Sequence, residues 1–227
     1  MRYGEPPTQL GSFEVNCKEM MFYQYLPIKL IGEIQPTYEN RLKCFDDLIG
    51  SICCDFIGVF GLDKYRESYI YLTAKFMYQM PNCSFNRTGY HSDGFMTDDI
   101  NYIWSDKNPT IFNTTDFELS QDDKKSLIEM EWQEDKRKQI QFDNNVLLRL
   151  NQFNIHKVNE SGYQGMRTFL KVSFSKDKYD LIGNSHNYLL DYDWDMKERQ
   201  SERNIPQTTI KYYEKRKPKR SRKKSNT

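Results

Sequence analysis

The segment from Met166 to Ser175 limits the possible folds most strongly, because two kinds of residue alternate along it. One face of an extended strand here would carry Met166, Thr168, Leu170, Val172 and Phe174. The other face would carry Arg167, Phe169, Lys171 and Ser173. A strand with charged residues on its second face is typical of a β-barrel whose interior holds a polar ligand. The segment therefore predicts a closed or double-layered β structure.

Most of the other periodic segments also read as strands. They are rich in β-branched and aromatic residues and cover residues 26–34, 68–79, 100–104, 110–112, 146–150, 153–158 and 187–194. A helix is predicted after Pro36-Thr37, with apolar residues at helical spacing: Leu42, Phe45, Leu48, Ile49, Ile52, Cys53 and Phe56. A charged helix follows the capping sequence at Ser120 and runs to about residue 138. The expected fold is mainly β with flanking helices, built on a double-stranded β-helix (jelly-roll or cupin-like) core.

Composition indicates a single soluble domain. The chain has 227 residues, 29% of them charged, and a mean hydropathy of −0.85, without an apolar run that could span a membrane. We expect one domain over residues 1–210, with its core at about 68–192 and helical support at about 37–60. The odd count of five Cys and the absence of an apolar leader favour reduced thiols in a cytoplasmic protein. Scarce Ala beside abundant Asn, Lys, Ile and Tyr indicates an AT-rich viral or microbial genome, so the compartment would be host cytoplasm if viral.

The last seventeen residues, 211–227, form a basic tail with nine Lys or Arg and one acid, Glu214. Its apolar content is too low for a packed core, so we expect it to be disordered. The charge allows contact with nucleic acid or an acidic partner, or a solubilising role. No groove-reading helix or zinc knuckle accompanies the tail, so sequence-specific reading of nucleic acid is not supported.

A candidate metal site is centred on His91 and Asp93. In an extended strand these two side chains point to the same face, while Ser92 points to the other. Glycines flank the motif at positions 89 and 94, and glycine beside a strand often marks close backbone approach. An imidazole and a carboxylate, joined by a second imidazole, form the facial triad that holds non-haem Fe(II). The second imidazole would have to come from elsewhere in the chain, and His156 lies on a predicted strand.

Arg167 follows His156 by eleven residues on the next predicted strand. If the two strands form a hairpin, both side chains face the barrel interior. The pattern of His91-Ser92-Asp93, His156 and Arg167 over residues 68–175 resembles the Fe(II)/2-oxoglutarate-dependent oxygenase superfamily. The resemblance implies that His91, Asp93 and His156 bind Fe(II) as the catalytic centre. It implies that Arg167 binds the far carboxylate of 2-oxoglutarate.

The implied reaction is a dioxygenase (hydroxylase) reaction with O₂, in which 2-oxoglutarate is decarboxylated to succinate and CO₂ and a bound substrate is hydroxylated. The substrate stays open between a small molecule, a peptidyl side chain and a nucleobase. The near end of the cosubstrate would meet one of Tyr71, Asn86, Asn101, Tyr102 or Thr110. One alternative function is a cupin-like barrel that binds a metal or ligand without turnover. Another is a nucleic-acid-binding protein that acts through the basic tail.

A competing histidine and a competing acidic pair also occur. His186 is followed by Arg199, but the stretch around Arg199 is charged and has no β character, so His186 is expected in a loop. Asp98-Asp99 resembles a catalytic pair of carboxylates, yet it is interpreted as a solvated loop or a rim.

Overall fold

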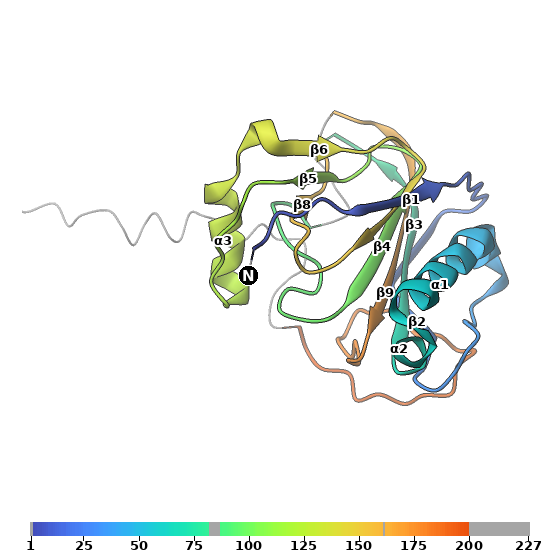
Figure 1. Cartoon of the computed structure of the whole chain (residues 1–227). Helices are drawn as coiled ribbons and strands as arrows, with labels where there is room; N and C mark the ends of the chain where they lie inside the picture. The colour runs from blue at the N-terminus through green and yellow to red at the C-terminus, as the bar shows by residue number, and fades with distance from the viewer. Residues whose placement is uncertain (1, 82–86, 161, 200–227) are drawn as a thin grey trace, which may run out of the picture.

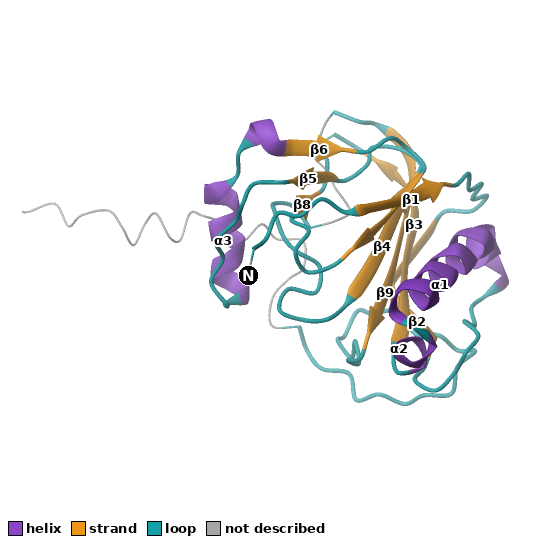
Figure 2. Ribbon diagram, in the orientation of Figure 1, coloured by secondary structure: helices purple, strands orange, loops and turns teal. Residues whose placement is uncertain are grey.

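A computed structural model describes residues 2–81, 87–160 and 162–199. The main layer is an antiparallel sheet of six strands (Figures 1 and 2). In spatial order the strands are β1 (Thr8–Ser12), β7 (Val146–Leu150), β4 (Ile100–Ser105), β9 (Gly165–Ser175), β3 (Tyr69–Gln79) and β2 (Met21–Lys29). The two long central strands, β3 and β9, pair along their whole length.

A second, smaller sheet forms another layer, with the order β6 (Gln139–Gln141), β5 (Ile111–Asn113), β8 (His156–Lys157). Figure 1 shows these three strands together on one side of the molecule and the N-terminal helices on the other. The helical elements are η1 (Asn40–Phe45), α1 (Asp46–Phe60), α2 (Leu62–Arg66), α3 (Asp123–Gln133) and η2 (Lys136–Lys138). The expectation of a mainly β protein with a few helices is confirmed. None of the helices in the described residues is long and apolar enough to cross a membrane.

The main core lies between α1 and the large sheet. Six of the seven apolar positions predicted from helical spacing are buried, two of them in η1 and four in α1, while Cys53 is half-buried. The ring of Phe56 stacks on that of Phe174 at 3.9 Å. Asp55 on the same helix accepts hydrogen bonds from Tyr102 of β4 and Arg149 of β7. Burial of apolar side chains therefore holds α1 on the sheet, and the hydrogen bonds of Asp55 add a charged contact at the edge of this core.

The alternation along β9 is confirmed. Leu170, Val172 and Phe174 belong to the core beneath α1, whereas Phe169 and Lys171 line a cavity on the opposite side of the sheet. Because successive side chains of a strand point to opposite faces, one strand serves both layers.

Several boundaries differ from the expectation. The first predicted strand lies earlier, at Met21–Lys29 rather than 26–34, and the segment 153–158 contains only the two-residue strand β8. The expected hairpin of β8 with β9 is wrong, because β8 pairs with β5 in the second sheet. At α3 the capping side chain is Asp122, which accepts from the backbone N–H groups of Lys124 and Lys125, so the cap at Ser120 is wrong.

The predicted strand at 187–194 is also wrong, since this segment has no strand. Aromatic packing holds it instead: Trp194 contacts Tyr71 of β3, whose ring stacks on Tyr179 at 4.0 Å. Asn187 is buried and donates to the carbonyl oxygens of Pro27 and Thr37. Side-chain contacts thus replace the β ladder that the sequence suggested. The basic tail 211–227 lies outside the described residues, so the domain limit at residue 210 stays a prediction.

Candidate metal centre

A cavity of about 220 Å³ lies against the face of the main sheet that is opposite to helix α1. Its walls come from β2, β3, β4, β9, β8 and the loop around residue 91. The lining residues are Gln24, Tyr25, Thr73, Lys75, Arg87, His91, Ser92, Asp93, Ile103, Thr110, His156, Val158, Phe169 and Lys171. All three residues expected to bind the metal are therefore in one cavity.

His91 and His156 lie side by side because their backbones pair. The N–H of each donates to the carbonyl oxygen of the other, at 2.9 Å in both directions. Residues directly opposite each other in an antiparallel pair present their side chains on the same face. The two imidazole rings accordingly lie 4.5 Å apart between centroids. Residues separated by 65 positions along the chain are thus held by main-chain hydrogen bonds.

The tautomer of each ring follows from its neighbours. The Nδ1 of His91 lies 3.0 Å from the carbonyl oxygen of Gly89, and the Nδ1 of His156 lies 3.0 Å from that of Asn154. A carbonyl oxygen can only accept, so both Nδ1 atoms carry a proton, and Nε2 is the atom of each ring that faces the group. Burial, followed by the nearby His156, lowers the pKa of His91 to about 3. Its imidazole is neutral at physiological pH, as metal binding requires.

Asp93 completes the group and is ionised. Burial raises the pKa of its carboxyl, but the ammonium of Lys171 and the imidazole of His156 outweigh burial and hold that pKa well below its usual range. Oδ2 of Asp93 lies 2.6 Å from Nζ of Lys171 and 3.4 Å from Nε2 of His156. The carboxylate therefore faces both the second imidazole and a cation.

His91, Asp93 and His156 could hold a metal ion, since one ligand atom from each lies within 4.8 Å of the others. Two imidazoles and one carboxylate suit Fe(II) and other first-row divalent ions, and this donor set contains no thiolate. The Lys171 ammonium keeps the Asp93 carboxyl in its anionic form, which is the form that binds a metal ion. The residues present therefore fit a divalent cation.

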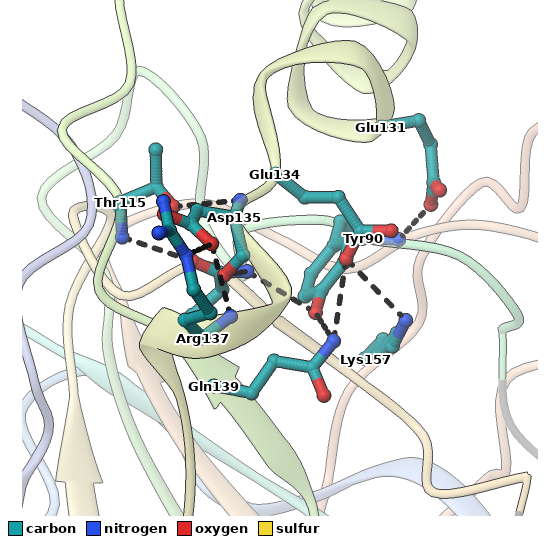
Figure 3. A network of polar contacts seen from close by, with 9 residues as sticks. Tyr90, Thr115, Glu131, Glu134, Asp135, Arg137, Gln139 and Lys157 are labelled. Atoms are coloured by element: carbon teal, nitrogen blue, oxygen red, sulfur yellow. Dashed lines mark hydrogen bonds and ion pairs between the residues drawn. The ribbon is translucent and has the colours of Figure 1, made fainter.

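The residues next to the two histidines belong to a second polar cluster, here called the brace, around Tyr90 and Lys157 (Figure 3). Tyr90 precedes His91, and Lys157 follows His156; the Lys157 ammonium lies 4.2 Å from the centroid of the buried Tyr90 ring. Glu131 of α3 accepts from the Tyr90 N–H at 2.6 Å, and Glu134 lies 3.8 Å from the Lys157 ammonium. The Tyr90 hydroxyl accepts from Gln139. The predicted charged helix, α3, thus supports the backbone beside His91 through Glu131, and Glu134 at its C-terminal end contacts the residue after His156.

Both glycines beside the motif are required by space. Gly89 has φ +79°, and a Cβ there would lie 3.0 Å from Oε1 of Glu131. Gly94 has φ +71°, and a Cβ there would approach the side chains of Thr97 and Asp99 at 2.8 and 2.9 Å. A side chain at either position would be strained by backbone conformation and by contact.

Arg167 lies on the same face of β9 as Lys171, but it is not among the residues that line the cavity. Its Nε donates to the carbonyl oxygen of Lys107 at 2.9 Å, and its guanidinium lies 5.2 Å from the centroid of the Phe169 ring. Burial lowers the pKa of Arg167 to about 10. The cation that reaches the metal group is Lys171, four residues further along the strand.

The structure places the other candidate residues named from the sequence in different environments. His186 is exposed in a loop and packs on Tyr188 and Tyr192, as expected. Thr110 lines the cavity, whereas Tyr102 and Tyr71 bond to Asp55 and to the carbonyl oxygen of Asp177. Asn101 is buried against Ser173, and Asn86 lies outside the described residues. Asp98 is exposed, while Asp99 is buried and accepts from Tyr179, so the two carboxylates do not act as a pair.

Sequence reasoning did not single out Lys75, Arg87 and Lys171 as site residues, nor Glu131 as a support. The alternation along β9 could have indicated Lys171, because it places Lys171 on the same face of the strand as Arg167. The same alternation along β3 places Thr73 and Lys75 on one face. No local pattern marks Glu131, whose role depends on packing between distant segments.

Comparisons with protein-family models, curated proteins and solved structures found no match to this chain. The argument for function therefore depends on the site itself.

We expect His156→Ala and Asp93→Ala each to abolish tight binding of one Mn(II) ion, because each removes one of three ligands. His186→Ala is the matched control, since it removes the third histidine of the chain without touching the group. Electron paramagnetic resonance of free Mn(II) during titration measures the affinity. Equal loss in all three variants would show that the ion binds elsewhere.

Glu131→Ala is expected to weaken Mn(II) binding about tenfold, because supporting residues around metal ligands typically contribute effects of that size. Glu131→Gln should retain most of the affinity, since its carbonyl oxygen can still accept from the Tyr90 N–H. Glu129→Ala is the control on the same helix, because the Glu129 carboxylate bonds to Ser120 instead. Isothermal titration calorimetry measures the Mn(II) affinity of each variant. Identical affinities in Glu131→Ala and Glu129→Ala would show that Glu131 does not support the metal ligands.

Proposed function

We propose that the protein is a metal-dependent oxygenase that uses Fe(II) and 2-oxoglutarate to hydroxylate a bound substrate. The observation that carries the proposal is the convergence of His91, Asp93 and His156 in one cavity. Three protein ligands on one side leave coordination positions for a cosubstrate and O₂. The bound metal would supply the activation of O₂ coupled to oxidative decarboxylation of the cosubstrate.

The path of the chain supports a double-stranded β-helix. Following the sequence, β3 lies in the main sheet, the His91 segment pairs with β8, and β4 lies in the main sheet again. The chain then crosses to β5 and β6, returns in β7, crosses to β8 and returns in β9. Repeated alternation between two antiparallel layers is the connectivity of a jelly roll. The cavity would then lie between the two sheets, with His156 on β8 of the smaller sheet and His91 on the segment that pairs with it.

Lys171 is the better placed anchor for the far carboxylate of 2-oxoglutarate. It is 8% exposed, it lines the cavity, and its ammonium is beside the metal group. A lysine in a cavity is paired with an anion because an isolated buried charge is costly. Asp93 is one partner of the Lys171 ammonium here, and the cosubstrate carboxylate would become a further partner once a metal ion binds Asp93. Arg167 remains the alternative anchor, from its position behind Phe169.

The function is tested by succinate release. We expect release that requires both Fe(II) and 2-oxoglutarate, and its loss in Asp93→Ala. Asp98→Asn is the matched control, because that carboxylate is exposed nearby and outside the metal group. Mass-spectrometric quantification of succinate measures the result. Tight metal binding without succinate release under any condition would favour the non-catalytic cupin-like alternative.

Two variants decide which cation holds 2-oxoglutarate. Lys171→Met is expected to raise the apparent KM for 2-oxoglutarate at least about tenfold, since it removes a charged hydrogen bond. Arg167→Met should change that KM less, because the Arg167 side chain does not line the cavity. Initial rates at saturating Fe(II), with Mn(II) affinity measured in parallel, separate cosubstrate binding from metal binding. The opposite ranking would restore Arg167 as the anchor.

A further inference from the structure

Two cysteines from separate segments of the chain lie in contact. Cys17 belongs to the connection between β1 and β2, and Cys44 lies in η1. Their Sγ atoms are 3.3 Å apart, and both residues are free thiols. A disulfide bond brings two Sγ atoms to about 2.0 Å, so a side-chain movement of about 1 Å would join them. The fold thus places two thiols, 27 positions apart in the sequence, where they can be linked.

The hydrogen bonds of the pair indicate which thiol would react first. Cys44 donates to the carbonyl oxygen of Arg41 at 3.8 Å, and a thiol has one proton, so Cys17 is the donor between the two sulfur atoms. Burial raises the pKa of both thiols. The hydrogen bond between them adds to this rise at Cys17 and opposes it at Cys44. Cys44 is also half-buried where Cys17 is buried, so Cys44 meets an oxidant first.

The thiol pair is separate from the candidate metal centre. Cys17 belongs to the core between α1 and the main sheet, and Cys44 packs against that core. The cavity with the histidines is on the opposite face of the sheet, and its lining contains neither cysteine. A reaction of the two thiols is therefore independent of the proposed function.

A bond between Cys17 and Cys44 would enclose β2 in a covalent ring. This strand lies at the edge of the main sheet, and its pairing with β3 is interrupted by two register shifts. The segments that lead into and out of β2 are joined by an ion pair of Arg41 with Glu19 at 3.3 Å, and both of these side chains are largely exposed. Exposed ion pairs contribute little to stability. A covalent link across the same segments restricts the unfolded chain and so favours the folded one.

We propose that Cys17 and Cys44 form a reversible disulfide that closes a ring around β2 and stabilises the fold under oxidising conditions. The oxidant is a small disulfide such as glutathione disulfide. The Cys44 thiolate attacks one sulfur atom of the oxidant, which forms a mixed disulfide and releases one glutathione thiolate. The Cys17 thiolate then attacks the Cys44 sulfur and releases the second glutathione. The two protein thiols lose two electrons and two protons, and glutathione disulfide is reduced to two molecules of glutathione.

The proposal is tested by redox titration of the full chain. The protein is equilibrated with different ratios of reduced to oxidised glutathione, over many hours because thiols with a raised pKa exchange slowly. Free thiols are then blocked with N-ethylmaleimide, and mass spectrometry of the digested protein identifies the linked peptides. We expect a link between the peptides of Cys17 and Cys44 that dithiothreitol removes. Links between other cysteines only, or no link at all, would overturn the proposal.

Oxidation should also raise the melting temperature by about 5 °C or more, as is typical of a disulfide that closes a ring in a chain of this size. Cys44→Ser should abolish this shift, and Cys44→Ala provides a second variant with the same readout. Cys54→Ser is the matched control, because it removes an exposed thiol of α1 and should keep the shift. A Cys17–Cys44 bond without a higher melting temperature, or a shift that persists in both Cys44 variants, would contradict the proposal.

Discussion

The structure of the site depends on one short antiparallel contact, the reciprocal backbone hydrogen bonds between His91 and His156. Side chains alone could not hold two imidazoles at 4.5 Å across a loop of this length, because each ordered side chain loses conformational entropy. Main-chain pairing fixes both Cα positions and leaves only ring rotation, which the carbonyl oxygens of Gly89 and Asn154 then restrict. The ligand geometry is therefore a property of the backbone.

Side chains on both sides of this backbone contact contribute to the site. The inner side presents His91, His156 and Asp93 to the cavity. On the outer side, Tyr90 and Lys157 lie beside Glu131 and Glu134 at the end of helix α3 (Figure 3). Since neighbouring residues of an extended segment point in opposite directions, each histidine has a supporting neighbour. This polar cluster thus supports the candidate metal centre from the outer side, and Glu131 accepts a hydrogen bond from the backbone N–H of Tyr90.

Features with a local period could be read from the sequence. The alternation along β9 and the helical stripe of α1 were predicted correctly, because burial on one face follows directly from residue order. The grouping of His91, Asp93 and His156 was predicted from residue chemistry and agrees with the structure. The partner of β8 was wrong, because strand pairing depends on which layer a segment joins, and no local pattern records that. For the same reason sequence spacing favoured Arg167, whereas the cavity lining contains Lys171.

The contact between Lys171 and Asp93 links the metal to the cosubstrate on the proposed function. Oδ2 of Asp93 is the atom nearest the Lys171 ammonium, and the same carboxylate is the anionic ligand of the metal group. A metal ion that binds Asp93 would compete with Lys171 for the charge of that carboxylate and would weaken the ion pair between the two side chains. A dicarboxylate that binds afterwards would interact more strongly with the Lys171 ammonium, so the two binding steps would favour each other by linkage. A single carboxylate shared by two cations thereby gives a physical reason for the cosubstrate to bind after the metal.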